Sequence, residues 1–178
     1  MVSGVTSGLN KVEVKLKWDP SRWDQPPHHL DIIAATYSAE APYGPPAYVV
    51  HTESRSPDGT INLTRHSETG LGLGFVEVMV MELDRLAPSY TRVVVGVAIH
   101  QRGGLMTFAD VTNTKVVITE RYTELASDDF AGVADSTAAT VAEFNRNTTG
   151  AWELRQVLHG SDRDPVAFSR EMGQMTRP

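Results

Sequence analysis

The sequence contains no cysteine among its 178 residues. Without thiols the chain can form no disulfide, no thiolate-bound zinc or iron–sulfur site, and no cysteine nucleophile. It also lacks an excess of basic residues, since 16 Lys and Arg stand against 22 Asp and Glu, for a formal net charge of −6. A negative chain repels the phosphates of nucleic acids and anionic membrane surfaces, so we expect neither as a partner.

Two kinds of hydrophobic segment are missing as well. No run approaches the roughly 18 apolar residues that a membrane-spanning helix requires. The segment 1–10 has neither the basic start nor the apolar centre of a secretory signal. We therefore predict a cytoplasmic protein without membrane insertion.

What the sequence does contain is apolar residues that recur with a period of two. Val12, Val14, Leu16 and Trp18 alternate with polar residues, which is typical of a strand with one buried face. Similar short segments recur along the chain, and we expect further strands at 30–37, 47–53, 60–66, 75–83, 92–100, 115–122, 140–146 and 152–158.

Two of these segments carry additional information. The segment 75–83 sets valines at 76, 78 and 80 against Glu77, Met79 and Met81, which is again the alternation of a strand. The segment 92–100 is nearly all valine in its centre, so we expect a strand that is buried on both faces.

Helical signals are few and lie near the end of the chain. Asp164 is a suitable helix cap and Pro165 a suitable first helical residue, so we expect a short helix that runs to Met172 and ends at Gly173. Together these patterns predict one domain over residues 1–178. Its expected fold class is all-β dominated, a two-sheet β-sandwich with a short C-terminal helix.

Histidines and carboxylates offer one candidate metal site. His29 and Asp31 are two residues apart, so on a strand they face the same side. If His66 lies near them, the three residues form a mixed imidazole–carboxylate site. Histidines that are simply hydrogen-bonded on the surface or in the core are the alternative, and the sequence favours that alternative.

Signals for catalysis or phosphate binding are weak. The chain has no Gly-x-Ser-x-Gly nucleophile motif. The run Gly70-Leu71-Gly72-Leu73-Gly74 lacks the third spacing and the following helix of a dinucleotide-binding loop. We interpret this run as a conformationally demanding loop rather than as a phosphate cradle.

Several short motifs, taken in order along the chain, resemble one known family. They are residues 8–14 followed by Trp18-Asp19, then Leu30-Asp31, Ser56-Pro57-Asp58-Gly59, residues 70–77, Ile99-His100, residues 108–113, and Gly150-Ala151-Trp152 with Arg155. In this order and spacing they resemble the TerD family of tellurium-resistance proteins, over nearly the whole chain from about residue 8 to residue 173.

The resemblance implies a β-sandwich that binds calcium through acidic loops. It also implies a place in bacterial stress responses to tellurite and oxidants, and it implies no catalytic activity. The strand that precedes residue 8 in the family is reduced here to residues 1–7. That reduction would leave a sheet edge open for a second copy of the chain.

The expected calcium site departs from the family pattern. Three carboxylates that the family carries are replaced by His29, His66 and Phe75, while Asp31 and Glu77 stand at matching positions. Calcium takes about six to eight oxygen ligands, and imidazole nitrogen is a poor substitute. We therefore expect calcium binding that is weak or lost.

Glu68 is a further carboxylate that could join the remaining ligands. The leading hypothesis from the sequence is thus a TerD-like, non-enzymatic stress-response binding protein with a degraded calcium site and a protein partner or self-association.

Two alternatives remain open at this point. One is a transition-metal protein that holds zinc or nickel through His29, Asp31, His66 and Glu77. The other is an enzyme in which His100 or His66 acts as a general base.

Overall fold

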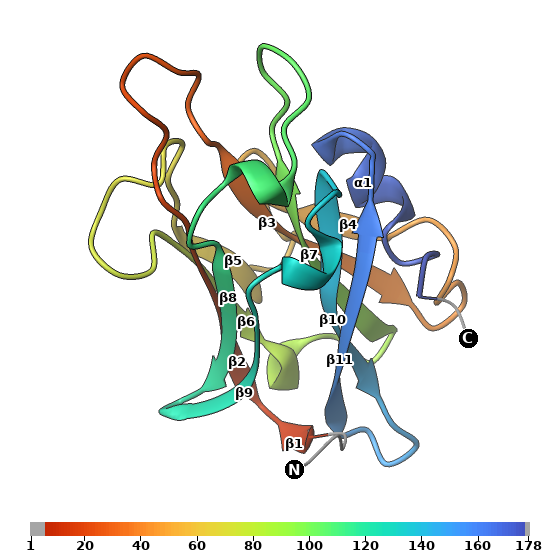
Figure 1. Cartoon of the computed structure of the whole chain (residues 1–178). Coiled ribbons are helices and arrows are strands. Elements are labelled where there is room, and N and C mark those ends of the chain that lie inside the picture. Colours follow the sequence, from red (N-terminus) through yellow and green to blue (C-terminus); the bar gives the residue numbers. More distant parts are fainter. Residues whose placement is uncertain (1–5, 177–178) are drawn as a thin grey trace.

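Alternating segments of the chain form two antiparallel β-sheets that pack face to face, as the computed structural model of residues 6–176 shows (Figure 1). Sheet A has the strand order β1 (Thr6–Leu9), β11 (Trp152–Ser161), β10 (Ala138–Arg146), β7 (Tyr90–Ile99), β3 (Leu30–Ser38) and β4 (Tyr48–Val50). Sheet B has the order β5 (Ile61–Arg65), β6 (Glu77–Glu82), β2 (Lys11–Lys17), β8 (Lys115–Glu120) and β9 (Thr123–Asp128). The predicted two-sheet sandwich is confirmed.

Helical structure is limited to short pieces. Three 3₁₀ turns, η1 (Leu83–Arg85), η2 (Phe108–Asp110) and η3 (Ala131–Val133), lie in connections, and α1 (Pro165–Glu171) lies near the C-terminus. The side chain of Asp164 caps α1 by accepting a hydrogen bond from the backbone N–H of Ala167, as its sequence predicts. No helix in the described part of the chain is long and apolar enough to cross a membrane.

The main core lies between the two sheets and contains the residues with the predicted alternation. Val12, Val14 and Leu16 are completely buried, and Trp18 is 3% exposed. A second, smaller core lies on the outer face of sheet A, where Phe168 of α1 and Met172, directly after α1, cover it. Because β7 contributes to both cores, the valine-rich segment is buried on both faces, as predicted.

The strands differ from the sequence prediction in four places. In β6 the inward residues are Glu77, Met79 and Met81, while Val78 and Val80 are only partly buried. β9 was not predicted, because its residues are mostly polar and only half-buried at the edge of sheet B. β4 is shorter than predicted, since the chain turns at residues 51–54. β1 forms at the edge of sheet A, and residues 1–5 lie outside the described residues.

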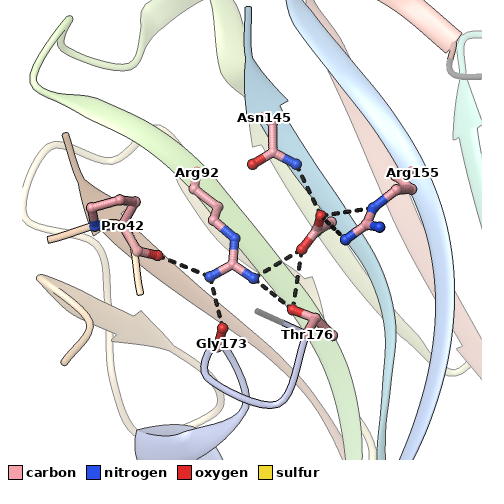
Figure 2. A network of polar contacts seen from close by, with 7 residues as sticks. Pro42, Arg92, Asn145, Arg155, Gly173 and Thr176 are labelled. Carbon is pink, nitrogen blue, oxygen red and sulfur yellow. Dashed lines mark hydrogen bonds and ion pairs between the residues drawn. The ribbon is translucent and has the colours of Figure 1, made fainter. Parts of the chain in front are cut away.

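A network of buried charges fastens the C-terminal segment to sheet A (Figure 2). Arg92 on β7 is 1% exposed and donates hydrogen bonds to the backbone oxygens of Pro42 and Gly173 at 2.9 and 2.8 Å. Its other terminal nitrogen donates to Glu143 at 2.9 Å and to Thr176 at 2.5 Å. One guanidinium therefore joins four parts of the chain that are distant in sequence.

Glu143 on β10 completes this network. It accepts further hydrogen bonds from Arg155 on β11 and from Asn145. The rings of Tyr37 and Tyr43 lie 5.2 and 4.5 Å from the Arg92 guanidinium carbon, which adds cation–π contact. Burial by itself would raise the pKa of Glu143, but the hydrogen bonds and charges of Arg92 and Arg155 hold this pKa below its ordinary value.

Candidate functional site

Three titratable side chains meet at one end of sheet A. His29 directly precedes β3, Asp31 is its second residue, and His100 directly follows β7. The two strands are antiparallel neighbours in which Leu30 pairs with Ile99, and the ladder continues with a 2.8 Å hydrogen bond from the backbone N–H of His100 to the backbone oxygen of His29. This register brings the three side chains together on the outer face of the sheet.

The cluster is compact and mostly buried. His29 is 5% exposed and Asp31 is 3% exposed, whereas the side chain of His100 keeps 30% of its surface exposed. The rings of His29 and His100 are stacked, with centroids 3.9 Å apart and an interplanar angle of 7°. Each imidazole approaches one oxygen of Asp31, at 3.3 Å for His29 Nε2 and 2.7 Å for His100 Nε2. A carboxylate between two imidazoles can stabilise a positive charge on either ring or help to hold a cation.

Asp31 is ionised in this environment. Burial by itself would raise the pKa of Asp31, but the neighbouring His100 and His29 hold it well below its usual range. Thr52, in the turn after β4, adds a side-chain hydrogen bond of 3.3 Å to the same carboxylate oxygen that His100 contacts. The other oxygen of Asp31 and both ring nitrogens of His29 are buried without a hydrogen-bond partner.

Glu77 lies on the other side of β3. It points inward from β6 and is completely buried, and its carboxyl group accepts a 2.5 Å hydrogen bond from the backbone N–H of Ile32. Burial, and secondly the negative charge of Asp31, raise the pKa of Glu77 to about 9. At neutral pH Glu77 is therefore a neutral acid, and its Oε1 atom has no hydrogen-bond partner.

The other residues considered for the site, His66, Glu68 and Phe75, lie closer to the surface and outside the cluster. His66 and Glu68 are exposed, in the connection between β5 and β6. His66 lines a cleft of about 260 Å³ together with His51 and Thr52. Neither His66 nor Glu68 belongs to the compact histidine–aspartate cluster found among residues 6–176. Phe75 is partly exposed, and its ring lies 5.6 Å from the Lys17 ammonium.

The glycine-rich loop, residues 70–74, packs against Trp18, which in turn contacts the backbone next to this cluster. Gly70 has a φ of +86°, and a Cβ atom there would lie 2.5 Å from Nε1 of Trp18. That indole nitrogen donates a 2.8 Å hydrogen bond to the backbone oxygen of His28, directly before His29. The loop thus requires glycine for close approach and left-handed backbone, as the sequence indicated. Its leucines, Leu71 and Leu73, point to solvent.

The sequence does not predict that His100 joins His29 and Asp31, or that Thr52 contacts them. His100 stands out in the sequence only in the family motif Ile99-His100 and as a candidate general base. The spacing of His29 and Asp31 marks a shared strand face, but no local pattern indicates that β7 pairs with β3 and brings His100 beside them.

Comparisons with known proteins agree on one family. The model of the TerD domain matches residues 2–168 of the chain. The tellurium resistance protein TerD of an Alcaligenes species is 27% identical over 161 residues, which cover 88% of this chain and 83% of that protein. TerD of Serratia marcescens is 26% identical over 164 residues, covering 89% and 85%.

Solved structures give the same answer. The crystal structure of a homologue of the telluride resistance protein TerD from Streptomyces coelicolor A3(2) is 64% identical, with a TM-score of 0.92, and the match covers 93% of this chain and 98% of that one. A crystal structure of a protein of unknown function is 54% identical, with the same TM-score and coverage. The family match spans nearly the whole sandwich, and the chain therefore belongs to the TerD domain family of tellurium-resistance proteins.

Proposed function

We propose that this chain is a non-enzymatic, cytoplasmic binding protein of the tellurite and oxidative stress response, in which the calcium site expected from the family resemblance is degraded. Family membership supports the link to tellurium resistance. The observation that carries the rest is the placement of Asp31 and Glu77, the two carboxylates that remain at family positions.

These two carboxylates lie on opposite faces of β3, so the one unpartnered oxygen that each retains does not face a common cation. Asp31 is engaged by His100 and Thr52 on the outer face of sheet A, and Glu77 is engaged by the backbone of Ile32 on the inner face. Glu68 is exposed and contributes to no cluster within the described residues. Calcium needs about six to eight oxygen ligands around one point, so this arrangement disfavours calcium.

Thermal unfolding with and without calcium tests the proposal. A site with a dissociation constant of about 10 µM would stabilise the fold by roughly 2.7 kcal/mol at about 1 mM calcium, and would raise Tm by roughly 5–10 °C. We expect a shift below about 2 °C, with magnesium as the matched control. A shift of several degrees that is specific to calcium would contradict the proposal.

A restored site sharpens this test. The triple variant His29→Asp, His66→Asp and Phe75→Asp returns the three carboxylates, and we expect part of the calcium-dependent shift to return. The variant should be measured by circular dichroism first, because His29 is buried and a carboxylate there adds charge beside Asp31.

The histidine–aspartate pair does not by itself favour an enzyme. His100 and Asp31 form the pair expected of a general base and its orienting group. However, the ring of His100 has no Ser, Thr or Tyr hydroxyl as a hydrogen-bond partner within residues 6–176, and none of the four clefts described in the structure is lined by His100. This geometry supports a binding role.

The cellular role is tested by deleting the gene in its native host. We expect growth to become more sensitive to tellurite and to peroxide, and re-expression of the chain to restore it. Unchanged growth under both stresses would contradict a role in this response.

We also propose that two copies of the chain associate through the edge of sheet A. β1 pairs with β11 only at Trp152–Leu154, so the part of β11 beyond Leu154 has no strand beside it on that edge within the described residues. Leu158 lies there and is 36% exposed. Unpaired edges favour pairing with another strand.

Light scattering against protein concentration measures this association. We expect dimers that Leu158→Lys weakens, whereas Leu73→Lys, at an exposed loop position, serves as the matched control. A strict monomer at the highest concentration would contradict the proposal.

A further inference from the structure

Buried polar atoms without hydrogen-bond partners gather at the end of sheet A that holds His29. They are Nδ1 and Nε2 of His29 and Oδ1 of Asp31. In folded proteins nearly all buried polar atoms have a hydrogen-bond partner, so such a group indicates a bound water or ion. We propose that His29, Asp31 and His100 bind a divalent transition-metal ion of the zinc or nickel type.

The distances within the cluster suit such an ion. One ligand atom from each of the three residues lies within 4.8 Å of the others. Ligands bonded to a tetrahedral zinc ion at about 2.0–2.2 Å lie roughly 3.3–3.5 Å from one another. His29 Nε2 and Asp31 Oδ1 are already 3.3 Å apart without hydrogen-bond geometry. A metal ion between them would give partners to two of the three unpartnered atoms.

Binding requires one imidazole to turn. The two rings are stacked with an interplanar angle of 7°, and the lone pair of an imidazole nitrogen lies in the plane of its ring. Two parallel lone pairs do not meet at one ion. The side chain of His100 is 30% exposed and that of His29 only 7%. His100 therefore has the space to turn. When it turns, its 2.7 Å contact with Asp31 breaks, and the ion enters from the His100 side.

The donor set selects the class of metal. Two imidazole nitrogens and one carboxylate suit zinc, nickel and cobalt, whereas calcium and magnesium require mostly oxygen. The remaining coordination position faces the His100 side, where solvent has access. The Thr52 hydroxyl, 3.3 Å from Asp31 Oδ2, orients the carboxylate from outside.

This site differs from the four-residue site suggested by the sequence. His66 is exposed and outside the cluster, and Glu77 lies on the opposite side of β3. The proposal goes beyond the binding function above and does not depend on calcium. A zinc titration therefore tests the histidine–aspartate site, and a calcium titration of the same protein separately tests the degraded calcium site.

Calorimetric titration of the full chain, freed of metal with EDTA, tests the site. We expect one zinc ion and one nickel ion per chain, and a visible absorption band when cobalt is added instead. His100→Ala should weaken zinc binding by at least about tenfold, because one of three protein ligands is lost. The side chain of His100 is 30% exposed, so we expect this variant to fold, and Asp31→Asn provides a second, isosteric variant.

His66→Ala is the matched control, because it removes an exposed histidine outside the cluster. We expect its zinc affinity to equal that of the wild type. Three outcomes would overturn the proposal: no zinc binding at millimolar concentration, which would assign the unpartnered atoms to water; binding that His100→Ala leaves unchanged; or equal weakening by His66→Ala.

Discussion

Two groups of buried charge on sheet A have opposite characters. In the Arg92–Glu143 network, both terminal nitrogens of Arg92 and both oxygens of Glu143 have hydrogen-bond partners (Figure 2). At the other end of the sheet, His29 and Asp31, together with Glu77 of the facing sheet B, leave four buried polar atoms without hydrogen-bond partners. One group is almost fully paired and the other is not.

The difference fits a structural role for the first group and the proposed binding role for the second. A paired buried network contributes cohesion and specifies one arrangement of the chain. In the Arg92–Glu143 pair only Nε of Arg92 is buried without a hydrogen-bond partner. Unpartnered buried atoms cost free energy unless something binds to them. The predictions below test whether the two ends of sheet A differ in this way, beginning with the largest expected effect.

Arg92→Met should destabilise the fold by about 3–5 kcal/mol, because it leaves the buried carboxylate of Glu143 without its buried partner. It also frees the backbone oxygens of Pro42 and Gly173 from their donor. Urea unfolding followed by circular dichroism measures the loss. Arg155→Met is the control, and we expect a smaller loss because this side chain is 49% exposed. Equal losses would show that the burial of Arg92 does not matter.

The two buried glutamates should give opposite pH dependences. The folded state holds the proton of Glu77 to about pH 9, whereas the unfolded chain releases it near the ordinary value of 4.5. The stability that neutral Glu77 contributes is therefore complete below about pH 4.5 and is lost as the pH rises towards 9. In EDTA, Glu77→Gln should be as stable as the wild type at low pH and should gain on it by about 1.4 kcal/mol per pH unit as the pH rises from about 4.5 towards 9.

Glu143 has a lowered pKa, so its contribution is present at neutral pH and is lost as the pH falls below its ordinary value. Glu143→Gln should therefore be less stable than the wild type at pH 7 and lose this difference in acid. Unfolding free energies measured from about pH 2 to about pH 9 would contradict the comparison if both variants shifted stability in the same direction.

Gly70→Ala tests how tightly the glycine-rich loop packs against the end of sheet A that carries His29, Asp31 and His100. The new Cβ would meet Nε1 of Trp18 at 2.5 Å at a φ of +86°, so we expect a loss of about 2 kcal/mol. Gly74→Ala is the matched control, since its φ is +68° but nothing lies within 4 Å, and we expect about 1 kcal/mol. Thermal unfolding of both variants measures the difference, and equal losses would mean that the Trp18 contact is easily relaxed.

Local patterns in the sequence account for most of the strands. Alternation at Val12, Val14 and Leu16 requires one buried face, and the valine-rich β7 requires two. The same reasoning fails for β6, where Glu77 takes an inward position among methionines. In a local sequence pattern, a buried glutamate looks the same as a glutamate that faces solvent. The inward position of Glu77 depends on a hydrogen bond from the backbone of Ile32, which lies in the other sheet.

By itself, the sequence determined the sandwich, the capped C-terminal helix, the family motifs and the shared face of His29 and Asp31. Only the tertiary structure decided that His100 joins them, that His66 does not, and that Arg92 meets Glu143. The physical reason is that strand alternation is a property of neighbouring residues, whereas these contacts depend on the pairing of β3 with β7 and of β7 with β10. Such pairing joins residues separated by 69 and 51 positions, and no local period records it.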